Sequence, residues 1–421
     1  MISNLRNCFF GTDTLISTHC GFTSRVYLNN AATPLAAKPA IQESYKTLPI
    51  YSYGNEPNDL SAQLTSKYNE VRDIVMDFIG ADPSLDTVIY TSNTTSAINI
   101  LSQVYYEHDP DQVVLTTRME HMANYLPFRE KMKTLLIGLT PEGNVDISDY
   151  AAKLEQYSGQ IKLVAVTGAS NITGIIPPFY DMAAMAHSHG AKILVDAVQL
   201  VQHKSFTMKP HDDASHIDFV SFDGHKFYTG QSGGVLVGDK VFLDQYKPLM
   251  YGAGITEFVS NSKIIYKGSP ERYEAGYPNF LGIISFGAAI RFLNEIGMKN
   301  VEEWERRLYR HLIRRLSQIP NLILHGNVYN NTRTPFVAFN LKDMSYQTLA
   351  NRLGYEYGID IGVGTNGANL YVQDLLGITD EQALSLYRSG EGYGIVRASI
   401  GLFNNYGDID RLADALFSIS L

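Results

Sequence analysis

Cysteine is scarce in this chain of 421 residues, which contains only Cys8 and Cys20. Two thiols near the N-terminus can build neither a disulfide framework nor a cysteine metal cluster, so we expect a reducing, cytoplasmic compartment and no metal site. Long apolar runs are missing too. No stretch reaches the roughly 20 apolar residues of a membrane-spanning helix. Residues 1–18 lack the apolar run and cleavage site of a secretory signal, so we expect neither a membrane protein nor an exported one.

A concentrated block of lysine and arginine is also absent, and the formal net charge is -9. Because nucleic-acid binding needs a concentrated positive surface, we expect no nucleic-acid partner. The chain is 45% hydrophobic and 18% charged, which is typical of an ordered globular protein. Its length predicts two or three domains, and we take two as the starting estimate.

From about residue 86 onward, short β-branched runs alternate with helical stretches, which predicts an α/β domain with a largely parallel sheet. The runs are 87–90, 113–116, 163–166, 193–195, 219–221 and 235–237. Polar residues follow three of them, namely 91–95, Asp196 and Lys226. Because ligands gather at the carboxyl ends of parallel strands, we expect these three segments to meet at one edge of the sheet.

The C-terminal third has a different pattern. Residues 281–316 have helical spacing with many charges, which predicts long helices that bridge two domains. Two further strands and a final helix predict a smaller α+β domain, and they are expected at 336–339, 395–398 and from 408 onward. The predicted organisation is a leader at 1–24 that packs on the small domain or the active site, a large domain at 25–290, and a small domain at 291–421.

Each polar segment has an ordinary explanation when taken alone. Lys226, in residues 221–226 (SFDGHK), could be an exposed loop lysine, although a lysine of lowered pKa readily forms a Schiff base. Asp196 ends an apolar run, where a carboxylate must either form a pair or face a cavity. It could cap the helix or loop that follows, or it could pair with a pyridinium nitrogen. Residues 91–95 (TSNTT) precede a helix, whose N-terminus favours an anion such as phosphate.

In this order, the segments resemble the class V, or cysteine-desulfurase-like, group of fold-type I pyridoxal-phosphate (PLP) enzymes. The matching segments run from 27–34 (YLNNAATP) to 396–399 (VRAS), nearly the whole chain. The resemblance implies an α/β fold-type I PLP-dependent transferase, with a mainly parallel seven-stranded sheet in the large domain and a smaller C-terminal α+β domain. It also implies pyridoxal 5'-phosphate as cofactor, an amino-acid substrate, and a homodimer with shared active sites.

The resemblance implies a role for single residues as well. Lys226 would hold PLP as a Schiff base, and His121 would stack on the ring and help in proton transfer. Asp196 would pair with the pyridine nitrogen, and Arg397 with the substrate carboxylate, for which a guanidinium fork is well matched. The residues implied to bind the cofactor are Thr94, Thr95, His121, Asn171, Asp196, Gln199, His225, Lys226 and Tyr277. The residues implied to bind the substrate are Asn30, Ala31, Asn171, Asn369 and Arg397.

Three positions depart from the family's pattern. Desulfurases carry a nucleophilic cysteine in a mobile loop, but the corresponding residues 362–371 contain none, and Asn369 lies near the expected position. An asparagine cannot serve as a sulfur nucleophile. Asp223 stands where the family offers a Ser or Thr hydroxyl to the phosphate, and since two anions repel, we expect it to point away. Tyr277 replaces the usual threonine of a segment that family members present to the neighbouring subunit's phosphate.

Because the loop cysteine is missing, the reaction we predict is β-elimination from a sulfur-containing amino acid, which is a C–S lyase activity. Transamination and epimerisation stay open as alternatives. A desulfurase-like reaction with another thiol is also open, and it needs the leader to fold over the site. A binding protein on this fold is disfavoured because it would not need the lysine, aspartate, histidine and arginine together. No Gly-x-Gly-x-x-Gly follows the first strand, which disfavours a dinucleotide-binding oxidoreductase.

Overall fold

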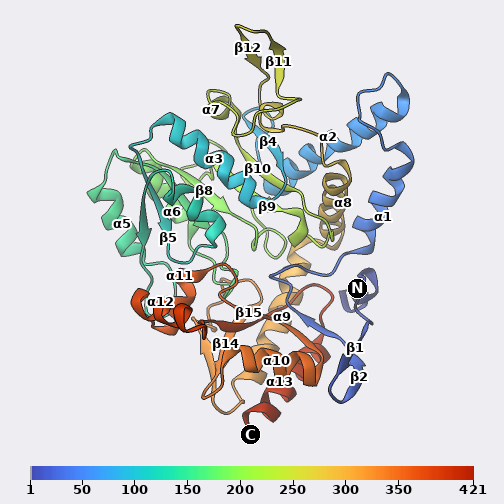
Figure 1. Cartoon of the computed structure of the whole chain (residues 1–421), viewed down its shortest axis with the longest axis vertical. Helices are drawn as coiled ribbons and strands as arrows, with labels where there is room; N and C mark the ends of the chain where they lie inside the picture. Colours follow the sequence, from blue (N-terminus) through green and yellow to red (C-terminus); the bar gives the residue numbers. More distant parts are fainter. Residues whose placement is uncertain (1) are drawn as a thin grey trace.

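The computed structural model describes residues 2–421 and contains two large sheets, one above the other in Figure 1. The upper sheet has seven strands in the order β4-β10-β9-β8-β7-β5-β6. Only β10 is antiparallel to its neighbours, so the predicted mainly parallel, seven-stranded sheet is confirmed. The strands are β4 (Asp86–Thr91), β5 (Val113–Thr117), β6 (Lys133–Ile137), β7 (Ile161–Thr167), β8 (Lys192–Asp196), β9 (Phe219–Asp223) and β10 (Gly234–Asp239).

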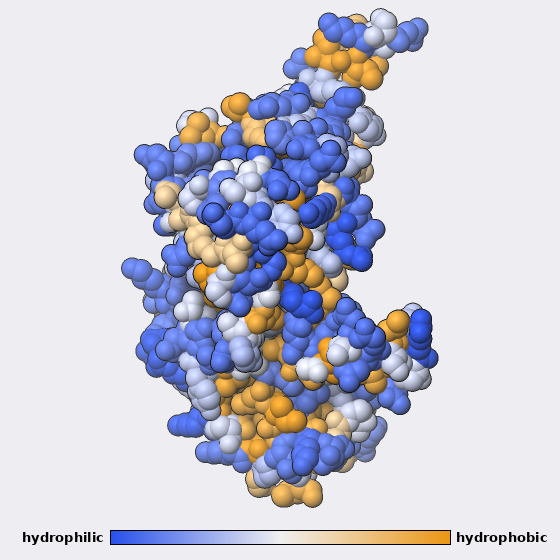
Figure 2. Space-filling model, turned by 90° about the vertical axis from the view of Figure 1, so that its left-hand side faces the viewer, coloured by the Kyte–Doolittle hydropathy of each residue, from blue (hydrophilic) through white to orange (hydrophobic). Residues whose placement is uncertain are grey.

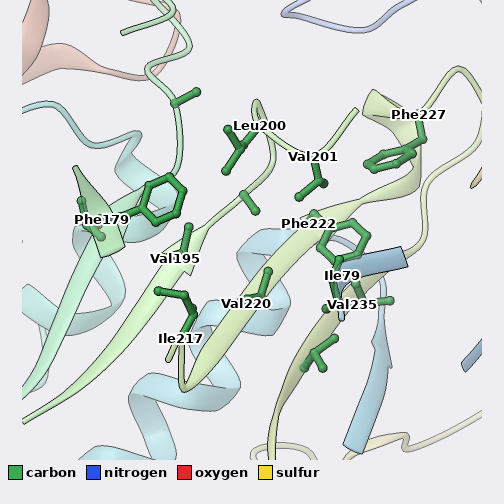
Figure 3. Packing of buried hydrophobic residues seen from close by; sticks show 14 of the residues in the cluster. Ile79, Phe179, Val195, Leu200, Val201, Ile217, Val220, Phe222, Phe227 and Val235 are labelled. Atoms are coloured by element: carbon green, nitrogen blue, oxygen red, sulfur yellow. The ribbon is translucent and has the colours of Figure 1, made fainter. Parts of the chain in front are cut away.

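Helices cover both faces of this sheet, which is why its central strands are buried along almost their whole length. Figure 3 shows one face, where Val195, Val220 and Phe222 pack beneath Leu200 and Val201. The helices that contribute to this face are α1 (Lys38–Thr47), α2 (Asp59–Ile79), α5 (Ile147–Gln156), α6 (Phe179–Ser188) and α8 (Phe280–Ile296). The opposite face packs against α3 (Thr94–His108), α4 (Leu126–Arg129) and α7 (Lys240–Leu243).

All six strands predicted in this region are present, and β6 was not predicted. Its sequence, KTLLI, is only five residues long, and four of its five residues are partly or fully exposed. β6 is the edge strand beside β5, so it lacks the continuous burial that makes a central strand recognisable.

The lower sheet has five strands in the order β13-β14-β16-β15-β3. They are β13 (Leu322–His325), β14 (Phe336–Leu341), β16 (Ile395–Ser399), β15 (Ile359–Gly364) and β3 (Val26–Leu28). The helices of this region are α9 (Met298–Leu316), α10 (Tyr346–Tyr357), α11 (Asn369–Leu376), α12 (Asp380–Ser389) and α13 (Tyr406–Ser420). The core of this part is separate from that of the large sheet and includes Leu312, Phe339 and Leu412.

The predicted domain limits stay a prediction, and two features of the fold bear on them. β3 lies within the range predicted for the large domain, yet it pairs in parallel with β15 of the smaller sheet. The limit at residue 290 falls inside α8, whereas the chain turns at Gly297, where α8 and α9 meet at a bend of 78°. Among the described residues, no single helix has the length and apolarity to cross a membrane; only the bent pair α8–α9 meets that test.

The leader packs beside the small sheet (Figure 1). Its hairpin of β1 (Leu15–Thr18) and β2 (Gly21–Ser24) lies against α10, and Arg6 forms an ion pair of 2.9 Å with Asp408 of α13. A second hairpin, β11 (Thr256–Val259) and β12 (Ile264–Tyr266), projects from the other end of the molecule. It carries exposed apolar residues such as Phe258 and Ile264. Figure 2 shows an apolar patch at this projecting end of the molecule.

Candidate active site

A cavity of about 620 Å³ lies at the carboxyl edge of the large sheet and gathers most of the predicted site residues. The predicted residues that line it are Ala31, Thr94, Thr95, His121, Asn171, Asp196, Gln199, His225, Lys226 and Arg397. They come from segments that follow five strands of the large sheet, from the loop after β3, and from β16 of the small sheet. The cavity therefore lies between the two sheets.

Lys226 follows β9 and reaches across the cavity to the loop after β3. Its Nζ donates hydrogen bonds to the carbonyl oxygens of Ala31, at 2.8 Å, and Ala32. Burial, followed by the positive charge of Arg397, lowers the pKa of Lys226 to about 7. Near neutral pH a large share of this amine is therefore uncharged, the form that acts as a nucleophile or a base.

Asp196 ends β8 with its carboxylate buried at the cavity wall, where its residue is 6% exposed. Its Oδ1 accepts a hydrogen bond of 3.2 Å from the backbone N–H of Val198. Burial raises the pKa of Asp196 to about 6, and no Lys, Arg or His of the described chain forms an ion pair with it. A buried carboxylate in this position favours a cationic ligand group as its partner. Gln199, one turn further on, donates to Ala31 O at 2.7 Å.

The His121 ring is accessible from the cavity and is held by its own loop. Its Nδ1 accepts a hydrogen bond of 3.1 Å from the N–H of Ala123, so the ring's proton is on Nε2 in the neutral form. Enclosure by the protein, and then the charges of Lys226 and Arg397, lower the pKa of His121 to about 4. Gly367 packs against the ring, and a Cβ at this position, where φ is +75°, would collide with it. His121 is therefore a neutral, positioned imidazole at neutral pH.

Arg397 of β16 is 1% exposed and has no carboxylate partner within 4.0 Å among residues 2–421. Its Nη1 donates to Asn171 O at 2.7 Å and its Nη2 to Asn29 Oδ1 at 3.0 Å, while its Nε has no hydrogen-bond partner. Gly362 on β15 leaves room for the guanidinium, because a Cβ there would lie 2.9 Å from Nε. Burial lowers the pKa of Arg397 to about 10, so it stays cationic at neutral pH. The cavity thus contains a fixed cation suited to an anionic group of a ligand.

The N-terminus of α3 forms another wall of the cavity. Asn93 caps this 15-residue helix by accepting a hydrogen bond of 3.0 Å from Ser96 N–H. Thr94 Oγ1 is buried and has no hydrogen-bond partner, and Thr95, His225 and Ser232 line the same wall. The helix N-terminus and the unpaired hydroxyl favour an anion here.

The expectation that Asp223 points away from this wall is wrong. Its Oδ2 accepts a hydrogen bond of 3.3 Å from Thr94 N–H, and its Oδ1 accepts one of 2.9 Å from His225 N–H. The Asp223 Oδ1 also lies 2.8 Å from His225 Nδ1. Burial opposes ionisation, but His225 and the backbone donors outweigh it and hold the pKa of Asp223 below its ordinary value. These donors stabilise the carboxylate in the position that an anionic ligand would also use.

Three predicted residues do not line the cavity. Asn30 is buried beneath it and donates to Ser399 O at 2.7 Å and to Asn404 Oδ1 at 3.1 Å. Asn369 is the first residue of α11. Tyr277 is 50% exposed and donates to Ser52 O at 3.0 Å.

The two thiols also lie away from the cavity. Cys8 is partly buried in the leader, and Cys20 is exposed in the turn between β1 and β2. The leader therefore contacts α13 and the core of the large sheet without bringing a sulfur atom to the site.

Two residues of this region were missed by sequence reasoning. The backbone carbonyl of Asn366 accepts a hydrogen bond of 2.8 Å from Asn171 Nδ2, and Asn366 lines the cavity in place of Asn369. Glu120 is buried beside His121, where it accepts from Thr117 Oγ1 at 2.6 Å and Thr167 N–H at 3.0 Å. Burial raises the pKa of Glu120 to about 8. The signal for Glu120 in the sequence was that it directly precedes His121.

Comparisons with known proteins agree with this architecture. The family Aminotransferase class-V matches residues 26–412. A cysteine desulfurase of Yersinia pseudotuberculosis serotype O:1b is 31% identical over 416 residues, which cover 96% of this chain and 95% of the relative. The structure of the cysteine desulfurase CsdA (S-sulfonic acid) from Escherichia coli has a TM-score of 0.83 at 25% identity, and covers 99% of this chain and 97% of that chain. The apo structure of a cysteine desulfurase from Thermococcus onnurineus NA1 has a TM-score of 0.83 at 28% identity, covering 94% of each chain.

The match extends over nearly the whole chain and includes every segment that lines the cavity. It confirms the predicted fold type and the predicted use of PLP by an enzyme. The chain belongs to the aminotransferase class-V family of PLP-dependent enzymes, and is related within it to the cysteine desulfurases.

Proposed function

We propose that this enzyme is a C–S lyase that eliminates a thiol from an S-containing amino acid. The Cα–H and Cβ–S bonds of the substrate break, the sulfur leaves as a thiol, and hydrolysis of the remaining fragment yields pyruvate and ammonia. The overall reaction consumes one water and needs no oxidant or reductant.

The observation that supports this proposal most directly is that no thiol lies in the cavity. Persulfide formation requires a thiolate that can attack the substrate sulfur. Neither Cys8 nor Cys20 lines the cavity, and the segment 362–371, where the family resemblance places the desulfurase cysteine, contains none. A family member without a cysteine in its cavity can still break the C–S bond by elimination, because elimination needs a base and no second nucleophile.

The residues present fit PLP. The unpaired Thr94 hydroxyl at the α3 N-terminus would take part in holding the phosphate, and Asp196 would pair with the pyridine nitrogen. The amine of Lys226 would hold the aldehyde carbon, with His121 beside the ring. When bound, PLP withdraws electrons from the substrate Cα and so acidifies its proton.

The chain's own residues would divide the remaining work. Arg397 binds the substrate carboxylate and so orients the Cα–H bond, since its fork matches a planar carboxylate. The Lys226 amine, whose pKa is near 7, takes the Cα proton. Neutral His121 has an Nε2–H group that donates to the departing sulfur.

The reaction can be tested by product analysis. Purified holoenzyme is incubated with cysteine, cystine and S-methylcysteine, and pyruvate, alanine and free thiol are measured. We expect pyruvate and thiol in equal amounts from S-methylcysteine. Alanine with sulfane sulfur would overturn elimination and support desulfuration by another thiol. Alanine formed only when a 2-oxo acid is supplied would indicate an aminotransferase, and loss of optical activity without pyruvate would indicate an epimerase.

We also propose that the enzyme is a homodimer and that it is located in the cytoplasm. The segment that carries Tyr277 leaves this side chain half exposed and outside its own cavity, as expected of a residue that serves a neighbouring subunit. Tyr51 and Tyr53 pack around Tyr277, so the surface is aromatic as well as exposed, which is typical of protein interfaces.

Removing the charge of Asp223 is expected to tighten cofactor binding about tenfold, because like charges at one site cost several kcal/mol and His225 offsets only part of this cost. The measurement is the equilibrium dissociation constant of PLP from apoprotein, for the wild type, Asp223→Asn and Asp223→Ser. Asp239→Asn, at the N-cap of α7, is the matched control. Weaker binding in both Asp223 variants would mean that the carboxylate organises the phosphate site.

A further inference from the structure

A second cavity of about 290 Å³ lies outside the active site, between α9 and residues 328–335. It shares no lining residue with the active-site cavity. Its lining includes many cationic side chains, which are Lys204, Arg306, Arg310, Arg314 and Arg333. The only acidic side chain in its lining is Glu305.

Three of these arginines form a row along α9. Arg306, Arg310 and Arg314 are spaced by four residues, so they lie on one face and span about 12 Å at 1.5 Å per residue. Arg306 pairs with Glu303. Arg310 and Arg314 have no carboxylate within 4.0 Å in the described part of the chain, and the nearest partner of Arg314 is His311 Nδ1 at 2.8 Å.

Arg333 is the buried member of the cluster and is 5% exposed. Its Nη1 donates to Asn327 O at 2.8 Å and its Nη2 to the carbonyls of Thr173 and Phe336, whereas its Nε has no partner. No carboxylate of residues 2–421 forms an ion pair with Arg333. A buried cation without a counter-anion is costly, and an anionic ligand lowers that cost.

The acid in the lining does not neutralise the cluster. Glu305 is 2% exposed and lies 2.9 Å from His203 Nδ1. Lys204 pairs at 3.8 Å with Glu302. The cavity therefore keeps an excess of positive charge, in a protein whose formal net charge is -9.

We propose that this arginine cavity binds a phosphorylated small molecule of nucleotide size. Guanidinium groups match phosphate oxygens in pairs, and the row on α9 can contact two successive phosphates. The apolar side chains of Ile313, Val328 and Pro335, with the 73% exposed Tyr329, provide a surface for a ring. The cavity volume suits one small ligand and is too small for a nucleic-acid groove contact.

The cavity is joined to the active site by direct contacts. Arg333 donates to the carbonyl of Thr173, two residues after Asn171, and the carbonyl of Asn171 accepts from Arg397. An occupant that pairs with Arg333 would thus stabilise the segment that positions the Arg397 guanidinium.

The test is isothermal titration of the holoenzyme, with PLP fixed by borohydride so that the active-site phosphate wall is filled. The probes are ADP, pyrophosphate and adenosine. We expect ADP to bind more tightly than pyrophosphate, and adenosine alone to give no measurable heat. Arg310→Glu/Arg314→Glu is expected to weaken ADP binding at least about tenfold.

The control variant Lys299→Glu/Arg388→Glu changes the net charge by the same amount at exposed sites on α9 and α12. It is expected to leave ADP binding within about twofold of the wild type. Arg310→Gln/Arg314→Gln tests the same contacts without a charge reversal, should the glutamates impair folding. No heat from ADP or pyrophosphate at millimolar concentration, or equal losses in both charge-reversed variants, would overturn the proposal. Binding of an acidic peptide at this cavity in place of ADP or pyrophosphate would also overturn the proposal.

Discussion

Replacing Lys226 by alanine is expected to lower turnover by at least about 10³-fold, because the same amine is the cofactor anchor and the proposed base at Cα. Among the residues that the structure describes, Lys226 is the only lysine that lines the cavity. His121 is neutral with a pKa near 4, and Arg397 stays protonated, so neither takes a Cα proton efficiently at pH 7.

The visible absorbance of bound PLP and its bleaching by borohydride distinguish this role of Lys226 from a general loss of structure. Wild-type holoenzyme is expected to show a visible PLP absorbance that borohydride bleaches, and Lys226→Ala is expected to lose it. Lys240→Ala, at an exposed lysine that begins α7, is the matched control. Retained absorbance in Lys226→Ala would show that another amine anchors the cofactor.

The pH dependence of cofactor attachment follows from the lowered pKa of Lys226. Only the neutral amine attacks the aldehyde, so the attachment rate should rise as the pH approaches 7 and level off above it. An exposed lysine with an ordinary pKa near 10.4 would instead give a rate that rises through pH 9. Stopped-flow mixing of apoprotein with PLP across pH 5–9 distinguishes these two profiles.

The predicted residues that line the cavity share a simple geometry. Asp196, Thr94 and Lys226 follow strands that run in the same direction, and the carboxyl ends of such strands meet at one edge. The alternation of apolar runs also predicted the strands of the large sheet, with the exception of β6 at its edge. The order of these residues along the chain was enough to predict where they lie, because each is within a few positions of the end of a strand.

Residues whose position depends on distant partners could not be located in this way. Asp223 faces the α3 N-terminus because Thr94, 129 positions earlier, supplies a backbone donor. The loop after β15 turns at Asn366, where φ is +47°, and this turn places Asn366 rather than Asn369 at the cavity. The arginine cavity could not be predicted from the sequence, because Arg333 and the row of arginines on α9 come together only in the folded chain.

Replacing Arg397 by glutamine is expected to weaken binding of an amino-acid substrate on the order of 10²- to 10³-fold. Removing one partner of a buried, hydrogen-bonded charge pair costs roughly 2–5 kcal/mol, and each 1.4 kcal/mol is a factor of ten. The guanidinium is fully enclosed, has one unpaired N–H group, and lacks a carboxylate in the described chain, so the substrate carboxylate is its expected partner. Arg397→Lys should recover little of the loss, because an ammonium group cannot bind a carboxylate through a planar fork.

The control compares two amines that differ only in the carboxylate, S-methylcysteine and 2-(methylthio)ethylamine. Their dissociation constants are read from the change in PLP absorbance of wild type, Arg397→Gln and Arg388→Gln, where Arg388 is exposed on α12. We expect Arg397→Gln to weaken only the amine that carries the carboxylate, and Arg388→Gln to change neither. Arg397 also holds the carbonyl of Asn171, so equal losses for both amines would show that its main role is to position that segment.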